Sequence, residues 1–263
     1  MKNFLKGVLV GIANIMPGVS GSVFLIVLKL YDKCIKAISD IFKKPKQSLK
    51  TLTPIALGIL VGTYLFSNVI SYFLNNYLNI TSIVFVGLIF GTIPTLIKES
   101  TKKGFKEPYL IPFFIALTIG TITIFYTPEI LTNNQASIPI LLITGLIIAI
   151  STIVPGISTT ILLSMIGMYK IYINAISTIN LKILIPVLIG LIIGGFIISK
   201  IINYLLTKYY SYTYFAILGF TLSTIPSLVK GIPLTKEDLI IGIPLSIIAF
   251  IITNKSLNIK GIW

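Results

Sequence analysis

The sequence has no histidine, no arginine, one cysteine and only seven acidic residues among its 263 residues. Without imidazoles, and with so few carboxylates, the chain lacks the usual ligands of a catalytic metal and the usual acid–base groups of an enzyme. The single Cys34 excludes an internal disulfide and a multi-cysteine metal site, so we expect this thiol to pack against apolar neighbours. The composition therefore predicts a protein with no metal, no cofactor and no enzymatic activity.

Charged residues are scarce as well. They make up 11% of the chain, whereas 55% of the residues are hydrophobic and the mean hydropathy is +1.00. This composition is typical of a polytopic membrane protein, so we expect residues 1–263 to form a single multi-pass domain in the cytoplasmic membrane. The formal charge of +14 comes entirely from lysine, which in such a protein indicates membrane topology rather than a nucleic-acid partner.

A short motif occurs twice. The segment Met-Pro-Gly-Val-Ser-Gly-Ser at residues 16–22 returns as Val-Pro-Gly-Ile-Ser-Thr-Thr at residues 154–160. In both copies an apolar run of about a dozen residues leads into Pro-Gly, and a second apolar run follows the hydroxylated residues. Proline and glycine interrupt a helix, so we expect breaks at Pro17 and Pro155. Serine or threonine after the break can cap a new helix, which predicts two half-helices in each copy.

The similarity of the two halves extends beyond this motif. Residues match at a constant offset of 138 around the breaks and at 132 after a loop that is six residues longer in the first half. Internal duplication is a common plan for secondary transporters. We therefore predict a first repeat over about 1–130 and a second over about 138–255. The matched pairs include Gly7 and Gly145, Tyr31 and Tyr169, Gly58 and Gly190, Gly62 and Gly194, and Gly87 and Gly219.

Three long apolar runs follow each break. If each broken segment dips into the membrane and returns, a half has three crossings and the halves are inverted; if it spans, the halves are parallel. Re-entrance with a cytoplasmic N-terminus places 17 lysines inside and 4 outside, against 15 and 6 for the best spanning arrangement. The positive-inside rule therefore favours an all-α protein of two inverted repeats, each a re-entrant broken-helix hairpin plus about three transmembrane helices. The runs lie at about 52–74, 80–97, 109–126, 183–206, 212–229 and 239–252.

Two opposed breaks at the middle of the membrane predict an anion site. Non-helical backbone at that depth needs protein or water as a partner, and free N–H groups at helix N-termini attract anions. A helix terminus contributes only roughly 0.3–2 kcal/mol, whereas burying an ion costs several kcal/mol, so the site must be wet or contain a cation. The candidate cation is Lys29, beside Asp32; alternatively Lys29 reaches the membrane surface. The predicted phosphate-binding residues are Gly18, Ser20, Gly21, Ser22, Gly156, Ser158, Thr159 and Thr160.

The two Pro-Gly segments, each followed about a dozen residues later by Tyr31 or Tyr169, resemble the two signature segments of the family catalogued as domain of unknown function 368. The resemblance covers essentially the whole chain. It implies a flippase that returns polyprenyl phosphate, undecaprenyl phosphate in bacteria, across the cytoplasmic membrane for cell-envelope glycopolymer synthesis. The chain departs from the family at Gly21-Ser22-Val23, where Gly-Gly-Thr is usual, and at Lys29 and Thr159, where glycine is usual; the second copy has Gly167 at the position of Lys29.

Other interpretations remain open at this point. The breaks could be tight kinks whose small residues let helices pack closely. The same two helix termini could serve a small-anion transporter or channel, and a membrane polyprenyl diphosphate phosphatase is a further alternative with few residues to support it. No phosphate loop for ATP is present, and no carboxylate lies obviously inside an apolar run, so no energy source is indicated. The sequence also leaves open whether the chain forms a homo-oligomer.

Overall fold

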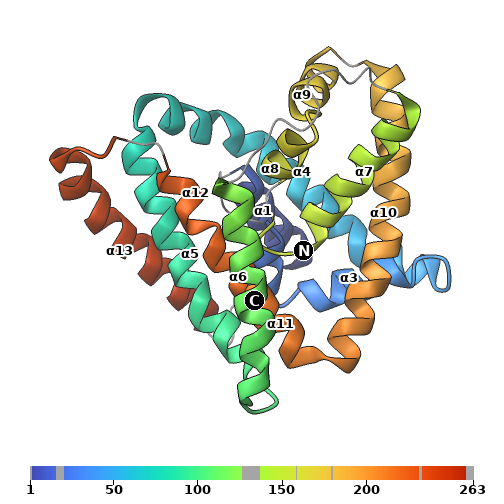
Figure 1. The fold of residues 1–263 in the computed structure, drawn as a ribbon, viewed down its shortest axis with the longest axis horizontal. Coiled ribbons are helices and arrows are strands. Elements are labelled where there is room, and N and C mark those ends of the chain that lie inside the picture. Colours follow the sequence, from blue (N-terminus) through green and yellow to red (C-terminus); the bar gives the residue numbers. More distant parts are fainter. Residues whose placement is uncertain are drawn as a thin grey trace.

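The computed structural model describes residues 2–15, 21–125, 137–157, 159–178, 180–230 and 233–258. Within these ranges the regular elements are helices (Figure 1). The first half contains α1 (Lys2–Ile15), α2 (Gly21–Val27), α3 (Tyr31–Ser39), α4 (Pro45–Asn76), α5 (Leu78–Ser100), the 3-10 turn η1 (Glu107–Tyr109) and α6 (Leu110–Phe125). The second half contains α7 (Ile138–Ile153), α8 (Thr159–Met165), α9 (Tyr169–Ser177), α10 (Leu181–Lys208), α11 (Tyr210–Ser223), α12 (Ile225–Val229) and α13 (Lys236–Asn258).

Among the described residues, four helices are long and apolar enough to cross a membrane, and they lie at Pro45–Phe66, Leu78–Ser100, Leu181–Lys208 and Lys236–Lys255. The prediction of an all-helical polytopic membrane protein is confirmed. Of the other two expected spans, α6 has 16 residues and α11 has 14. Half of the apolar window of α5 is buried, against 17% for α4, α10 and α13, so α5 lies inside the helix assembly and the other three face the lipid.

The two halves repeat one local packing arrangement. In the first half α1 packs along α4, and in the second half α7 packs along α10 (Figure 1). Glycines at matched positions permit both close approaches, because a Cβ atom there would overlap a backbone carbonyl oxygen of the neighbouring helix. Gly7 faces the Ile55 carbonyl as Gly145 faces that of Val187, and Gly58 faces the Phe4 carbonyl as Gly190 faces that of Leu142.

A one-residue corner recurs in the same way. Tyr77 separates α4 from α5, and Tyr209 separates α10 from α11. Their backbone angles are similar, with φ −141° and ψ 45° at Tyr77 and φ −125° and ψ 46° at Tyr209. Each N–H still donates to the carbonyl four residues earlier, at 2.8 Å and 2.7 Å, so the chain turns without leaving this donor unpaired. The sequence had suggested a longer polar connection at residues 75–79.

The halves exchange their last helices. The last helix of the second half, α13, packs along α5 of the first half, and α6 of the first half packs along α11 of the second (Figure 1). Matched glycines again mark both crossings: Gly87 lies against the Ser246 backbone and Gly219 against the Phe113 backbone. Each half therefore packs its last helix against a helix of the other half. The duplication of the chain and the relative inversion of its halves stay predictions.

The largest apolar core lies where the two halves meet. It joins side chains of α2, α3 and α5 to the end of α7 and to α10 and α11. The break-bearing segments of both halves are therefore held against the same central helices. The buried members are Val23, Ile26, Tyr31, Ile35, Leu96, Ile153, Ile202, Leu206, Tyr214, Ile217 and Leu218.

Candidate functional site

The second break is held against the centre of the molecule. Helix α7 ends at Ile153, Pro155 is fully buried, and α8 begins at Thr159. Gly156 has a φ of +85°, which L side chains rarely adopt. A Cβ atom on Gly156 would lie 2.5 Å from the Phe220 carbonyl carbon and 2.6 Å from the Thr221 nitrogen of α11. Glycine is thus required here both by the backbone angle and by the approach of another helix.

Part of the predicted site lies outside the described residues. This applies to Pro17, Gly18, Ser20 and Ser158, so the expected cavity at mid-depth stays a prediction. The helices that follow the breaks, α2 and α8, have only seven residues each, so each is shorter than the apolar run that contains it. The macrodipole of so short a helix is a sum over few peptide units. Binding of an anion at the start of α2 or α8 would therefore depend mainly on individual N–H and hydroxyl donors.

Thr159 is already engaged with the protein. Its hydroxyl lies 2.7 Å from the hydroxyl of the buried Ser151, which in turn donates to the Ile148 carbonyl at 3.0 Å. Either hydroxyl can be the donor of this bond, which links α7 to α8 across the break. With Thr159 as the donor, it would have to release Ser151 before donating to a phosphate oxygen; with Ser151 as the donor, the Thr159 hydrogen is available. Thr160 is in α8, and its side chain lies outside the described part.

The corresponding position in the first half is arranged differently. Gly21 stands where Thr159 stands in the second half, and the Asn14 side chain fills the space that a Cβ atom on Gly21 would need. Asn14 is exposed, whereas Ser22 is buried with 4% of its surface accessible. A small residue at position 21 therefore brings an amide group of α1 beside the start of α2.

Tyr31 connects α3, in the first broken segment, to the second break. Its side chain is 1% exposed, and its hydroxyl donates to the Ile153 carbonyl over 2.9 Å. Ile153 is the last residue of α7, whose final carbonyls have lost their helical partners because the helix stops at Pro155. The tyrosine that follows the first break therefore satisfies the helix end at the second break.

The helices after the breaks both end in a left-handed residue. Lys29 has a φ of +58° and Gly167 a φ of +69°, at positions related by the offset of 138. The Leu30 N–H donates to the Leu25 carbonyl, and the Met168 N–H to the Leu163 carbonyl, a six-to-one pattern typical of a Schellman cap. Lys29 is exposed and lies roughly 10 Å along the chain from the start of α2. The structure thus places it at the far end of the helix from the break.

Replacing Lys29 with glycine is expected to stabilise the protein by about 1 kcal/mol, because a non-glycine residue in the left-handed region is strained by roughly that amount. We expect transport to be retained, since the ammonium lies away from the break. Chemical unfolding in mild detergent measures the first effect. Lys50→Gly, which removes the same charge from an exposed position inside α4, should instead destabilise the protein by about 1 kcal/mol. A loss of transport in Lys29→Gly alone would show that Lys29 supplies the missing cation.

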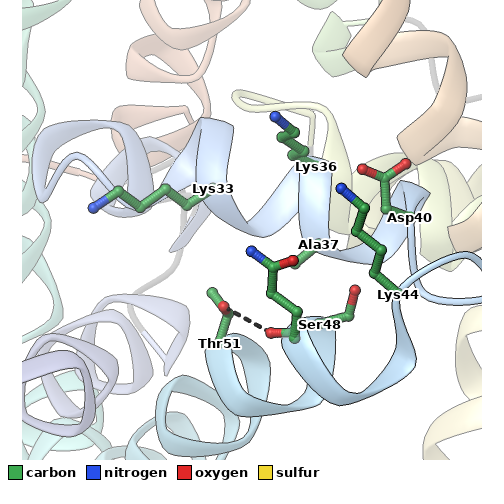
Figure 2. Close-up of a pocket in the computed structure, with 8 residues that line it drawn as sticks. Lys33, Lys36, Ala37, Asp40, Lys44, Ser48 and Thr51 are labelled. Carbon is green, nitrogen blue, oxygen red and sulfur yellow. Dashed lines mark hydrogen bonds between the residues drawn. The ribbon is translucent and has the colours of Figure 1, made fainter.

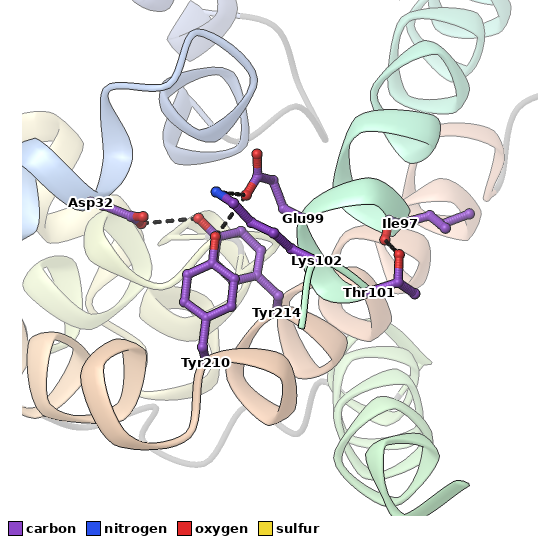
Figure 3. Close-up of polar contacts among 7 residues, drawn as sticks. All are labelled: Asp32, Ile97, Glu99, Thr101, Lys102, Tyr210 and Tyr214. Atoms are coloured by element: carbon purple, nitrogen blue, oxygen red, sulfur yellow. Dashed lines mark hydrogen bonds and ion pairs between the residues drawn. The ribbon is translucent and has the colours of Figure 1, made fainter. Parts of the chain in front are cut away.

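A polar network joins the first broken segment to α5 and α11 (Figure 3). The Tyr214 hydroxyl donates to Asp32 over 2.9 Å, and the Tyr210 hydroxyl donates to Glu99 over 2.7 Å. The two tyrosine rings lie 4.6 Å apart between their centroids. Lys102 completes the network with an ion pair to Glu99 at 3.1 Å. Two carboxylates from the first half are thus bound by two tyrosines of the second.

The single thiol is structural. Cys34 is buried beside Leu30 and Ile55, and this burial raises the pKa of the thiol to about 12. A thiol that stays protonated is a weak nucleophile and metal ligand, in agreement with the expected packing role. In the part of the chain that the structure describes, no group of three or more histidine, cysteine or acidic side chains could hold a metal ion.

Comparison with known proteins identifies the family to which this membrane protein belongs. A sequence profile of the VCA0040-like family, described as undecaprenyl phosphate translocase-like, matches residues 1–109 and residues 94–238. The chain belongs to this family. It is 31% identical over 265 residues to a polyprenyl-phosphate transporter of Staphylococcus aureus, covering 95% of this chain and 94% of the relative. It is 26% identical over 242 residues to a polyprenyl-phosphate transporter of Vibrio cholerae, covering 87% and 77% respectively.

Membership of this family agrees with three expectations from the sequence. Both relatives are bacterial proteins named as transporters rather than enzymes, so the chain is assigned no enzymatic activity. Together with the four candidate spans, the family identifies a multi-pass protein of the cytoplasmic membrane. The resemblance found from the two Pro-Gly segments is confirmed. No solved structure matches the chain.

Sequence reasoning missed several polar residues around the breaks. Ser151 and Asn14 interrupt the apolar helices that lead into the breaks, and a polar residue near the end of an otherwise apolar helix could have marked both. The pairing of Asp32 with Tyr214 joins residues from the two halves, and no local pattern in the chain indicates it.

Proposed function

We propose that this protein is a flippase that moves polyprenyl phosphate across the cytoplasmic membrane and holds its phosphate headgroup at the two Pro-Gly breaks. The isoprenoid tail stays in the lipid throughout. In a bacterial cell this movement would return the lipid carrier for the synthesis of cell-envelope glycopolymers. The observation that carries the proposal is the Tyr31 to Ile153 hydrogen bond, which joins the first broken segment to the second break in a member of this family.

The donors near the breaks suit a phosphate group. Gly21, Ser22 and Gly156 put short side chains and backbone next to each break, and the motif places Ser20 and Ser158 directly before α2 and α8. A hydrogen bond to a charged group contributes about 1.5–3 kcal/mol, more than the terminus of a seven-residue helix is expected to give. We therefore assign the headgroup mainly to hydroxyl and backbone N–H donors, with water completing its shell.

The reciprocal packing of the halves supports alternating exposure of such a site. Each half contributes its last helix to the other, and both broken segments are packed into the core that the halves share. If the halves are inverted repeats, as the lysine distribution indicates, rocking one half against the other would expose the headgroup first to one side of the membrane and then to the other.

Transport in proteoliposomes tests this proposal. We expect the intact protein to speed the crossing of a short-chain polyprenyl phosphate, and the Ser20→Ala, Ser158→Ala double variant to be slower by at least about tenfold. Loss of about 1.4 kcal/mol of transition-state stabilisation produces that factor. Thr178→Ala, Thr207→Ala is the matched control, because both exposed hydroxyls bond only to carbonyls of their own helices among the described residues.

Two results would contradict the proposal in different ways. If the serine double variant moves the lipid at the intact rate, the breaks do not hold the headgroup. If the intact protein moves inorganic phosphate or chloride in the absence of lipid carrier but never the lipid, the protein is a small-anion transporter. Both variants are compared at equal amounts of folded protein, checked by size-exclusion chromatography.

A further inference from the structure

A basic pocket lies between α3 and the start of α4 (Figure 2). Lys33 and Lys36 come from α3, and Lys44 is the N-cap residue of α4. The cavity volume is about 230 Å³. This is smaller than the roughly 300–1,000 Å³ of a site for a drug-sized ligand, but it accommodates a phosphate group with several waters.

The charges in this pocket are not balanced by the protein. Asp40 is the acidic residue among those that line it, against the three lysines. Within the described part of the chain, none of the three ammonium groups makes a hydrogen bond or an ion pair, although Lys36 and Lys44 extend beside Asp40 in Figure 2. Lys33 and Lys36 are three residues apart on α3, a spacing at which like charges on a helix are unfavourable. Figure 2 shows the Lys33 side chain extending away from Lys36 and Lys44.

A serine hydroxyl also lines this pocket. Ser48 is a mostly buried residue, with 3% of its surface exposed, and its oxygen makes no hydrogen bond to a residue that the structure describes. That oxygen still reaches the cavity, because the fully buried side-chain atom without a partner among the described residues is Ser211 Oγ. A phosphate oxygen, or a water in the shell of a phosphate, can therefore bind the Ser48 hydroxyl.

The N-terminus of α4 lacks the groups that usually stabilise the positive end of a helix dipole. Helix N-termini favour acidic side chains, yet the first turn of α4 contains none and begins at Lys44 without a side-chain cap. The matched helix α10 begins normally, since the Asn180 side chain accepts a hydrogen bond from the Lys182 N–H. The N-terminus of α4 therefore has neither an acidic side chain nor a side-chain cap, and an anion in the pocket would stabilise it.

The second half shows that the fold does not require these charges. At the offset of 138, Lys33, Lys36 and Asp40 correspond to Ile171, Asn174 and Thr178. The segment that contains Lys44 belongs to the loop that is six residues longer in the first half. The same supersecondary unit thus forms in the other copy with uncharged residues at these three positions.

We propose that this pocket is a second anion site, separate from the breaks, that binds a phosphate group. The lysines and the N-terminus of α4 attract the charge, and Ser48 donates from the floor of the cavity. The phosphate belongs either to a lipid headgroup or to a free phosphate ion, which present the same oxygens to these donors. The site is independent of transport at the breaks.

Isothermal titration calorimetry on the full-length protein in detergent tests this site with three probes: inorganic phosphate, farnesyl phosphate and a short-chain phosphatidylglycerol. We expect Lys36→Gln, Lys44→Gln to weaken binding of at least one probe about tenfold. Lys46→Gln, Lys50→Gln removes equal charge from exposed positions of α4 outside the pocket, and should change the Kd less than about twofold. The same comparison in the Ser20→Ala, Ser158→Ala background removes any contribution of the breaks.

The three probes distinguish the sources. Weakened binding of inorganic phosphate identifies a free phosphate site, and weakened binding of either lipid alone identifies a headgroup site. Ser48→Leu, which fills the cavity and leaves every charge in place, should weaken the same probe. The proposal is overturned if both lysine pairs have equal effects, if Ser48→Leu binds like the intact protein, or if no probe binds better than phosphatidylcholine. Size-exclusion chromatography confirms that each variant is folded.

Discussion

Gly156→Ala is expected to lower the free energy of unfolding by about 3 kcal/mol, because two unfavourable effects add at one position. Alanine at a φ of +85° is strained by roughly 1–2 kcal/mol. Its Cβ atom would also lie 2.5 Å from the Phe220 carbonyl carbon, and relieving such an overlap in a packed interior costs roughly 1–3 kcal/mol. Because the neighbour is backbone rather than a flexible side chain, α11 or the break itself must move.

Two other glycines separate these effects. Gly104 has a φ of +86° but no atom within 4 Å of an added Cβ, so Gly104→Ala should pay the backbone strain alone, about 1 kcal/mol. Gly195 has open space around an added Cβ inside α10, and Gly195→Ala should stabilise the protein by about 0.5–1 kcal/mol. Unfolding in mixed detergent measures all three. If Gly156→Ala lowers the free energy of unfolding no more than Gly104→Ala does, the close approach of Gly156 to α11 does not restrict the side chain at this position.

Tyr31→Ala is expected to lower the free energy of unfolding by about 4 kcal/mol, since removing a fully buried aromatic side chain typically costs about 3–5 kcal/mol. The ring packs in the core that the two halves share, and its hydroxyl donates to the Ile153 carbonyl. We expect Tyr31→Phe, which keeps the ring, to cost about 1–2 kcal/mol by leaving that carbonyl unpaired. The difference between the two variants measures the packing of the ring.

Tyr72→Phe is the matched control for the hydroxyl. Tyr72 is 57% exposed, and its hydroxyl has no hydrogen bond to a described residue, so its loss should change the stability by less than about 0.5 kcal/mol. Transport should fall in Tyr31→Phe even where the protein stays folded, because the first broken segment is no longer tied to the second break. If Tyr31→Phe has the same stability and transport rate as Tyr72→Phe, the hydrogen bond from Tyr31 to the Ile153 carbonyl contributes to neither.

The sequence alone determined the features that depend on composition and on local backbone chemistry. Hydropathy and the scarcity of charge identified a membrane protein, and the Pro-Gly pairs marked the breaks, of which the one at Pro155 lies among the described residues. The matched glycines were recognised as signs of duplication, and the structure shows that they stand where helices approach closely and a Cβ atom would not fit. The family resemblance followed from the same short segments. These signals depend on residues that are close together in the sequence, so they can be recognised without the structure.

The length of the helices after the breaks was a local feature that the sequence concealed. A run of about a dozen apolar residues suggested one half-helix, yet each of α2 and α8 ends after seven residues. Gly167 would have been a recognisable stop signal, whereas Lys29 gives no such signal. The left-handed conformation of Lys29 is indicated in the sequence only by the glycine at the matched position, Gly167.

Only the tertiary structure decided which helices pair and which side chains meet. The exchange of α6 and α13, the bond from Tyr31 to Ile153, the network of Asp32 with Tyr214, and the pocket at Ser48 all join segments that lie on different helices. In a soluble protein an apolar stripe marks the buried face of a helix. In lipid both the buried and the exposed faces are apolar, so periodicity does not show which face packs, and the partners emerge only in the folded chain.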